Sequence, residues 1–251
     1  MQHLTILTGG SRGMGRAIAE QLCRGDALVL CISRGRADAL DAFARERGAT
    51  LVQWSADLAD PAPVAARLRD WLGERDAKQL DSATLINNAG MLGGTGPLEA
   101  AGAVAIATAL RVDLEAPMQL TAAFIAATSG WNIARKVLNI SSGLGRRPMA
   151  GAALYCAAKA GMDHFSRCVA LEQAGRVNAV RIVSLAPGII DTDMQTELRA
   201  GDPAAFPEHD NFVRMKDSGA LKSPADAARR VLTYLAGPDF GDQPLADVRD
   251  A

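Results

Sequence analysis

The stretch Thr8-Gly9-Gly10-Ser11-Arg12-Gly13-Met14-Gly15 decides the fold of this chain. It follows a short apolar segment, 4–8, that is typical of a β-strand, and it opens a segment, 11–24, with the apolar spacing of a helix. Glycines let the backbone turn sharply and approach a ligand closely. Amides at a helix start, with the helix dipole behind them, favour a bound phosphate. A glycine triplet alone also fits an ordinary tight turn, but its place in the first strand–turn–helix unit predicts a dinucleotide-binding site.

The rest of the chain repeats this alternation of short apolar segments and longer helical ones. Strands are expected at 27–33, 51–55, 83–87, 136–141 and 180–185, and helices at 37–47, 63–74, 101–129, 151–174 and from the Ser223-Pro224-Ala225-Asp226 capping sequence to 236. Strands without strict alternation are buried on both faces, as in a parallel sheet covered by helices. We therefore predict an α/β fold, a single-domain doubly wound parallel sheet (Rossmann fold) over residues 1–251.

One segment, 199–222, interrupts this rhythm. It is polar and contains Gly201, Pro203, Pro207 and Gly219. It is too long for an ordinary connection, so we expect a loop or lid over the substrate.

Composition limits the possible functions. The chain has 251 residues, 49% of them hydrophobic, with 27 basic and 28 acidic side chains and a net charge of -1. This excludes a disordered chain and argues against a nucleic-acid partner or a polybasic membrane anchor. No apolar run approaches the roughly 20 residues that span a bilayer, and no signal peptide is evident, so we expect a cytoplasmic protein. Three separated histidines predict no metal site, and the four cysteines are expected as buried thiols.

The end of the second predicted strand indicates which dinucleotide is used. An NAD-selective site usually places an acid there, but this strand ends in Ser33-Arg34. Arg34 can bind a 2′-phosphate, and Arg12 in the glycine loop can add a second charge to the same phosphate. Both arginines also fit solvated surface charges. The joint pattern favours NADP(H).

Tyr155 and Lys159 are the candidate catalytic pair. Their i, i+4 spacing on a predicted helix places the phenol and the ammonium on one face. A nearby cation lowers a tyrosine pKa, which makes the phenol a usable acid or base. Ser142 lies just past the end of the fifth predicted strand, at the sheet edge where ligands gather. Ser141 competes for this role but is expected to face elsewhere.

With these residues the chain resembles the short-chain dehydrogenase/reductase family over nearly its whole length. The matching elements are TGGSRGMG (8–15), Asp57-Leu58, NNAG (87–90), Ser142 with Tyr155 and Lys159, and Pro187-Gly188 followed by Thr192. Within the family it is most similar to the sepiapterin reductase group, through INNAGMLG (86–93), ALYCAAKA (153–160) and APGIIDTDMQ (186–195).

The resemblance implies a role for each matching position. Ser142 would bind the substrate carbonyl oxygen, Tyr155 would protonate it, and Lys159 would hold the nicotinamide ribose and depress the tyrosine pKa. Asp57 and Leu58 would contact the adenine. The cofactor-binding set implied by the loop and the resemblance is Gly9, Ser11, Arg12, Gly13, Met14, Gly15, Arg34, Asp57, Leu58, Asn88, Ala89, Gly90, Tyr155, Lys159, Ile190 and Thr192.

Two acidic residues bear on how far the resemblance extends. Asp113 stands where the family usually has an asparagine that helps to hold a water of the proton relay. Either the carboxylate alters that relay, or Asp113 is a solvated or helix-distorting residue. Asp247 matches the position of an acid that holds the guanidine-like edge of the pterin in pterin-reducing relatives. It equally fits a structural aspartate in the last strand.

The resemblance also implies an assembly and a pocket. Family members pair through the helices that here cover about 101–129 and 151–174, so a homodimer or homotetramer is expected, with close approach at Ala122, Ala123, Ala126, Ala127, Ala157 and Ala158. The substrate pocket is expected at 92–96, 144–149, Met194 and 199–222.

The leading hypothesis is an NADPH-dependent carbonyl reductase that turns a ketone or vicinal dicarbonyl into an alcohol. A catalytically silent nucleotide-binding regulator is the alternative, because a fold does not determine a function. A sugar-nucleotide epimerase shares the tyrosine and lysine but usually carries a larger C-terminal domain than the sixty or so residues after Pro187.

Overall fold

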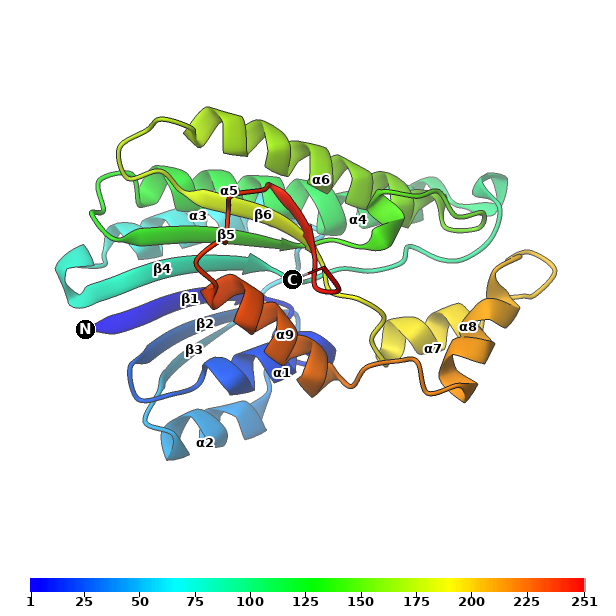
Figure 1. Cartoon of the computed structure of the whole chain (residues 1–251), viewed down its shortest axis with the longest axis horizontal. Helices are drawn as coiled ribbons and strands as arrows, with labels where there is room; N and C mark the ends of the chain where they lie inside the picture. The colour runs from blue at the N-terminus through cyan, green and yellow to red at the C-terminus, as the bar shows by residue number, and fades with distance from the viewer. Residues whose placement is uncertain (251) are drawn as a thin grey trace.

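The computed structural model describes residues 1–250 and is built on one parallel sheet in the order β3-β2-β1-β4-β5-β6-β7 (Figure 1). Every neighbouring pair of strands is parallel. The strands are β1 (Gln2–Thr8), β2 (Ala27–Ser33), β3 (Thr50–Ser55), β4 (Leu80–Asn87), β5 (Ala134–Ile140), β6 (Arg181–Ala186) and β7 (Leu245–Asp247). This confirms the doubly wound parallel sheet predicted from the sequence.

The strand order reverses between β1 and β4, and this reversal positions the site. The chain first builds outward through β2 and β3, then returns to place β4 on the other side of β1. The connections on the two sides of this point leave the sheet in opposite directions, which opens a crevice outside the carboxyl ends of the strands.

Helices cover both faces of the sheet in two layers (Figure 1). Alternate strand residues face opposite sides. Leu7 packs with the helices of one layer, whereas Leu4 and Ile6 pack with those of the other. The first layer holds α1 (Gly13–Leu22), α2 (Asp38–Glu46) and α9 (Pro224–Ala236), and the second holds α3 (Pro61–Gly73), α5 (Ala116–Ala127) and α6 (Ala153–Gln173).

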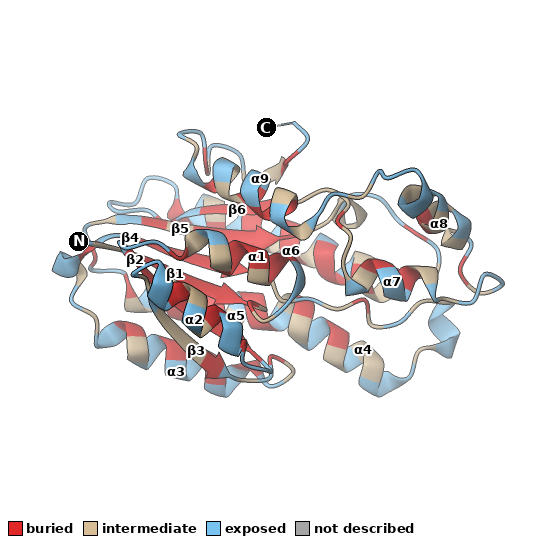
Figure 2. Ribbon diagram, turned by 90° about the horizontal axis from the view of Figure 1, so that it is seen from below, coloured by how far each residue is buried: buried red, intermediate tan, exposed pale blue. Residues whose placement is uncertain are grey.

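Two further groups of helices extend the molecule beyond the carboxyl edge of the sheet (Figures 1 and 2). One is α4 (Ala103–Leu110), which continues into α5 through a π-helical turn, η3 (Arg111–Glu115). The other is α7 (Asp193–Arg199) with α8 (His209–Asp217). The remaining short turns are the 3₁₀ helices η1 (Ala77–Gln79), η2 (Leu98–Ala100) and η4 (Gly143–Gly145).

The segment expected as a loop or lid, 199–222, contains a helix that was not expected, because α8 occupies its middle. Phe206 and Phe212 stack with 5.7 Å between ring centroids and belong to a third apolar cluster that includes Tyr155. The few apolar side chains of this polar segment therefore anchor it to the helix that carries the predicted catalytic pair.

Two other local expectations have opposite outcomes. The capping sequence before α9 is confirmed, since the Ser223 hydroxyl accepts a hydrogen bond from the Asp226 amide at 3.1 Å. The expectation of four buried thiols is wrong for Cys168, which is exposed on α6, and for Cys156, which is only half-buried on the same helix. Cys23 and Cys31 are buried, and burial raises the pKa of the Cys31 thiol to about 12.

Candidate functional site

A cleft of about 620 Å³ opens at the carboxyl edge of the sheet, where the strand order reverses. Its wall is assembled from the ends of β1, β2, β4, β5 and β6 and from the segments that follow them. Every residue that the sequence predicted for catalysis or cofactor binding lines it. Residues that are far apart in the chain thus share one cavity.

The glycine loop leaves space and donors for an anion. Gly9 and Gly13 have φ angles of 72° and 55°, a backbone region that favours glycine. A Cβ atom on Gly15 would lie 2.1 Å from the Gly9 carbonyl oxygen, so the loop closes tightly only without a side chain there. Helix α1 begins at Gly13 without a side-chain cap and without an acid in its first turn. The backbone amides of its first turn therefore have no side-chain partner and are available to bind phosphate oxygens in the cleft.

Thr8 fastens this loop to the neighbouring strand. Its hydroxyl accepts hydrogen bonds from the amides of Asn88 and Ala89 at 2.9 and 3.0 Å. The Asn88 side chain donates in return to the Thr8 carbonyl oxygen at 2.9 Å. The side chain of Asn88 thus holds the loop in place, while Ala89 and Gly90 line the cleft beside it.

The end of β2 presents an unpartnered hydroxyl together with a cation. Ser33 Oγ is buried and has no hydrogen-bond partner among residues 1–250, yet Ser33 lines the cleft beside Arg34. A buried hydroxyl in this condition is suited to a ligand group. Arg34 was expected here from the sequence and Ser33 was not, although the place of Ser33 as the last residue of the strand was a usable signal.

Arg12 does not share an anion site with Arg34 in this structure. Its guanidinium donates instead to Asp193 at 2.9 Å, joining the glycine loop to the start of α7. Both side chains of this ion pair are largely exposed, and exposed pairs contribute little to stability. Arg12 is therefore free to exchange partners at small cost.

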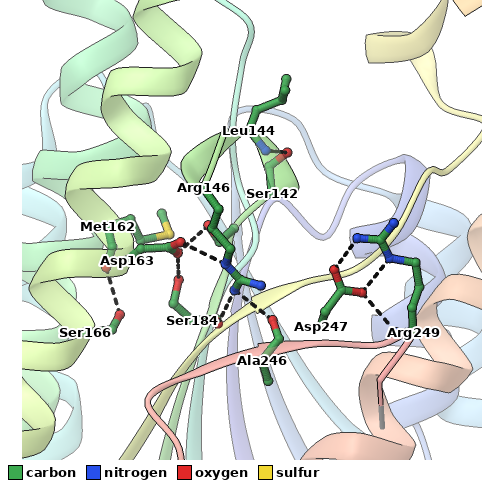
Figure 3. Close-up of polar contacts among 11 residues, drawn as sticks. Ser142, Leu144, Arg146, Met162, Asp163, Ser166, Ser184, Ala246, Asp247 and Arg249 are labelled. Carbon is green, nitrogen blue, oxygen red and sulfur yellow. Dashed lines mark hydrogen bonds and ion pairs between the residues drawn. The ribbon is translucent and has the colours of Figure 1, made fainter. Parts of the chain in front are cut away.

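Ser142 lies next to a hydrogen-bond network around Asp163 and is hydrogen-bonded to Leu144 (Figure 3). Ser142 follows β5, and its hydroxyl accepts a hydrogen bond from the Leu144 amide at 3.1 Å, which starts η4. The buried Asp163 carboxylate of α6 accepts hydrogen bonds from Ser141 at 2.6 Å and Ser184 at 2.7 Å, and it contacts Arg146 at 3.3 Å. The Ser141 hydroxyl is therefore bonded to Asp163 and does not take the role expected of Ser142, in agreement with the sequence expectation. Neither Asp163 nor Arg146 was predicted from the sequence.

Tyr155 and Lys159 lie together on α6, with the Lys159 ammonium 5.5 Å from the Tyr155 ring centroid. The predicted net direction of the tyrosine pKa is wrong. Burial raises the pKa of Tyr155 and outweighs the opposing effect of Lys159, while Asp113 raises it further and Ser142 lowers it. Tyr155 is therefore a neutral phenol at neutral pH, the form that donates a proton.

Asp113 lies inside the same group of side chains. It is 0% exposed, which excludes the solvated alternative, and it sits in the π-helical turn η3. Its Oδ1 accepts a hydrogen bond from the Met91 amide at 2.8 Å. Its Oδ2 lies 3.8 Å from Lys159 Nζ and has no hydrogen-bond partner among residues 1–250. Burial raises the pKa of Asp113, and the nearby Lys159 opposes this only in part.

Apolar and thioether side chains form the wall next to Tyr155. Those lining the cleft are Leu92, Leu144, Met194, Leu198, Phe212 and Met215. Of the expected pocket, only Leu92, Leu144, Arg147, Met194, Phe212 and Met215 line this cleft. Residues 93–96 instead border a separate hollow of about 170 Å³. Asp247 and Arg249 also line the main cleft, and Arg249 was not anticipated.

Neither a metal site nor a membrane-spanning helix is found in the described part of the chain. Across residues 1–250 no group of three or more histidine, cysteine, aspartate or glutamate side chains is arranged to hold a metal ion. Within the same residues, no helix combines the length and apolar character that crossing a membrane requires.

The chain is similar to known proteins over most of its length. A family model described as short chain dehydrogenase matches residues 3–203. Benzil reductase ((S)-benzoin forming) of Bacillus cereus is 35% identical over 235 residues, covering 94% of both chains. Sepiapterin reductase of Meriones unguiculatus is 31% identical over 259 residues, covering 98% of this chain and 95% of that protein. A short-chain dehydrogenase/reductase structure from Burkholderia vietnamiensis is 34% identical, covers 99% of this chain and 98% of its own, and superposes with a TM-score of 0.66.

The burial of Asp113 predicts a pH-dependent effect of Asp113→Asn on stability. Because folding raises the pKa of this carboxyl, the folded state favours its protonated form. Its contribution is greatest below the ordinary carboxyl pKa and is lost as pH rises through the raised value. Asparagine removes this titration. The unfolding free energy of the variant minus that of the parent should therefore be larger, in favour of the variant, at pH 8 than at pH 5.

Urea unfolding at the two pH values measures this difference. Asp81→Asn, which removes an exposed carboxyl, is the matched control. A difference between Asp113→Asn and the parent that stays constant from pH 5 to pH 8 would contradict the prediction.

Proposed function

Because this chain belongs to the short-chain dehydrogenase family, we propose that it is an NADPH-dependent carbonyl reductase, which turns a ketone or vicinal dicarbonyl into an alcohol. The observation that carries the proposal is the convergence of Ser142, Tyr155 and Lys159 on one cleft whose other end is the glycine loop. A buried neutral phenol beside a serine hydroxyl is suited to protonating a carbonyl oxygen.

The residues of the cleft fit a bound NADP(H), which supplies the hydride for the reduction when it is present. The first-turn amides of α1 would hold the pyrophosphate, and Arg34 with the unpartnered Ser33 hydroxyl would hold the 2′-phosphate. Asp57 and Leu58 would contact the adenine, and Ile190 and Thr192 the nicotinamide end. Lys159, already held by the Ile140 carbonyl oxygen at 3.1 Å, would bind the nicotinamide ribose.

In the proposed reaction Ser142 donates a hydrogen bond to the substrate carbonyl oxygen and fixes its direction. Tyr155 gives its phenolic proton to the same oxygen as the carbonyl carbon is reduced, so the carbonyl gains one hydride and one proton and becomes an alcohol. The Lys159 ammonium stabilises the phenolate that this leaves. Asp113, with its free Oδ2 facing Lys159, offers a further acceptor on this proton path.

The alternative is a regulator that binds the nucleotide without catalysis. No feature of the cleft favours it. Asp113, the one departure from the family pattern noted above, is buried against Lys159 with the other reactive groups in place.

Tyr155→Phe tests the chemistry, because it removes the proton donor and keeps the ring. Turnover of benzil with NADPH should fall by about a hundredfold or more, in line with the loss of general acid catalysis. NADPH binding, followed by its fluorescence, should persist. Tyr234→Phe changes the chain's other tyrosine, on α9, and should leave turnover unchanged. Near-normal turnover in Tyr155→Phe contradicts the mechanism.

Arg34→Ala tests the choice of cofactor. A charge-assisted phosphate contact contributes about 1.5–3 kcal/mol, so its loss should lower kcat/KM with NADPH by about tenfold or more and leave the value with NADH little changed. Arg12→Ala should have a smaller effect, because Arg12 already pairs with Asp193. Equal kcat/KM of the parent enzyme with NADPH and NADH would overturn the assignment.

The proposed assembly is a homodimer or homotetramer through α4, α5 and α6. Ala122, Ala126 and Ala157 are exposed and are small enough to allow close helix approach, and Val104 and Met118 expose apolar surface nearby in sequence. Ala123 and Ala158 are buried within the subunit, so the expectation that they take part in the contact is wrong.

Ala126→Glu tests this surface by placing a charge in the proposed contact. Light scattering at micromolar concentration should give a dimer or tetramer for the parent protein and a smaller species for Ala126→Glu. Ala66→Glu, on the exposed side of α3, should assemble like the parent. A monomeric parent protein would rule out the proposed assembly.

A further inference from the structure

Asp247 places a buried carboxylate at the edge of the cleft. It is the last residue of β7, and its side chain is only 6% exposed. Its neighbour in the sheet is Ala186, the end of β6, directly before Pro187 and Gly188 of the cleft wall. A buried carboxylate beside a cavity attracts a cationic or N–H-rich partner.

That partner is already supplied by the chain (Figure 3). Arg249 Nε donates to Asp247 Oδ1 at 2.8 Å, and Arg249 Nη2 donates to Oδ2 at 2.6 Å. The Arg249 amide adds a third hydrogen bond to Oδ1 at 2.9 Å. Both carboxylate oxygens are therefore occupied by a parallel pair of N–H donors, the two-pronged arrangement that guanidinium groups make with carboxylates.

The donors of Arg249 have the same geometry as the edge of a 2-amino-4-oxopteridine. That edge also presents two parallel N–H groups, so such a ligand must compete with Arg249 for the same oxygens. Only Val248 separates the arginine from the aspartate in the chain, so the effective concentration of Arg249 is at least about millimolar, as for a short tether. The competition therefore favours the internal partner over a dilute substrate.

The surroundings of the pair do not offer the ligand a second anchor. Arg146 is the other charged side chain next to Asp247, and it donates to the Ala246 carbonyl oxygen at 2.8 Å and faces Asp163. The apolar cluster that contains Tyr155 supplies much of the cleft wall beside the phenol, although Arg147, Gln195 and Glu197 also line the cleft. A neutral dicarbonyl with hydrocarbon substituents needs no carboxylate and matches that wall.

We propose that Arg249 is a specificity-determining residue, an internal occupant of Asp247 that excludes substrates with a guanidine-like edge and directs the enzyme to neutral vicinal dicarbonyls. This rests on the proposed carbonyl reductase activity and names its substrate class. The Arg249 side chain is 63% exposed and is held mainly by Asp247, so its removal opens the carboxylate without disturbing the core.

Arg249→Ala is the decisive variant, assayed with NADPH on benzil and on sepiapterin. Freed from Arg249, Asp247 can bind the pterin edge, so the ratio of kcat/KM for sepiapterin to that for benzil should rise about tenfold or more, mainly through KM for sepiapterin. Arg249→Ala combined with Asp247→Asn should lose this gain, because the carboxylate itself is then absent. Arg229→Ala removes an exposed arginine that pairs with Asp226 on α9 and should leave the ratio unchanged.

A binding measurement separates this proposal from the proposed activity. Pterin itself has the 2-amino-4-oxo edge but no side-chain ketone, so calorimetry reports its binding without turnover. It should bind Arg249→Ala about tenfold or more tighter than the parent protein. Equal pterin affinity in both proteins, or a parallel change of kcat/KM for the two substrates, overturns the role of Arg249. Failure of the parent enzyme to reduce any carbonyl, with pterin binding still dependent on Arg249, would overturn only the proposed activity.

Discussion

The carboxylate of Asp163 joins the elements on which the reactive groups depend. It projects from α6, which also carries Tyr155 and Lys159, and accepts hydrogen bonds from Ser141 after β5 and Ser184 in β6. Arg146 completes its surroundings and reaches the carbonyl oxygen of Ala246 in β7. One buried anion therefore fixes three strand ends relative to one helix. Buried charges persist only where such partners surround them, so the position of Ser142 opposite Tyr155 is determined with little freedom.

Short-range patterns were sufficient to predict the sheet, the glycine loop and the Tyr155–Lys159 pair, whereas the family resemblance implied most of the other residues of the cleft. Apolar runs identify the long strands, and polar residues directly after them lie at the carboxyl edge in any parallel sheet. The apolar pattern did not indicate β7, Leu245–Asp247, because this strand has only three residues, and only the family resemblance suggested a last strand at Asp247. The helix α8 was missed because most of its residues are polar and it depends on Phe212, whose partner Phe206 lies outside the helix.

What the sequence did not predict depends on burial and on distant pairing. The spacing of Tyr155 and Lys159 correctly places a cation near the phenol, but it contains no measure of how far the phenol is removed from water. Burial reverses the expected net direction of the tyrosine pKa. The pairing of Arg12 with Asp193 connects positions 181 residues apart, and no local pattern indicates it. By contrast, the pairing of Arg249 with Asp247 is local, and the short spacing of the two charges was an unused signal.

Asp113 and Lys159 lie close together in the cleft but do not form a fully hydrogen-bonded ion pair. At 3.8 Å the two groups attract one another, yet Oδ2 of Asp113 gains no hydrogen bond from the ammonium, which donates to the Ile140 carbonyl oxygen. A buried carboxylate with an unused oxygen is held at a free-energy cost. Burial of the phenol raises the pKa of Tyr155, and Asp113 raises it further in its ionised form. Both effects keep the proton on Tyr155 until an oxygen that is becoming an alkoxide approaches it. The free-energy cost of burying Asp113 therefore goes together with a protonated Tyr155, which is the form that a carbonyl reductase requires of its tyrosine.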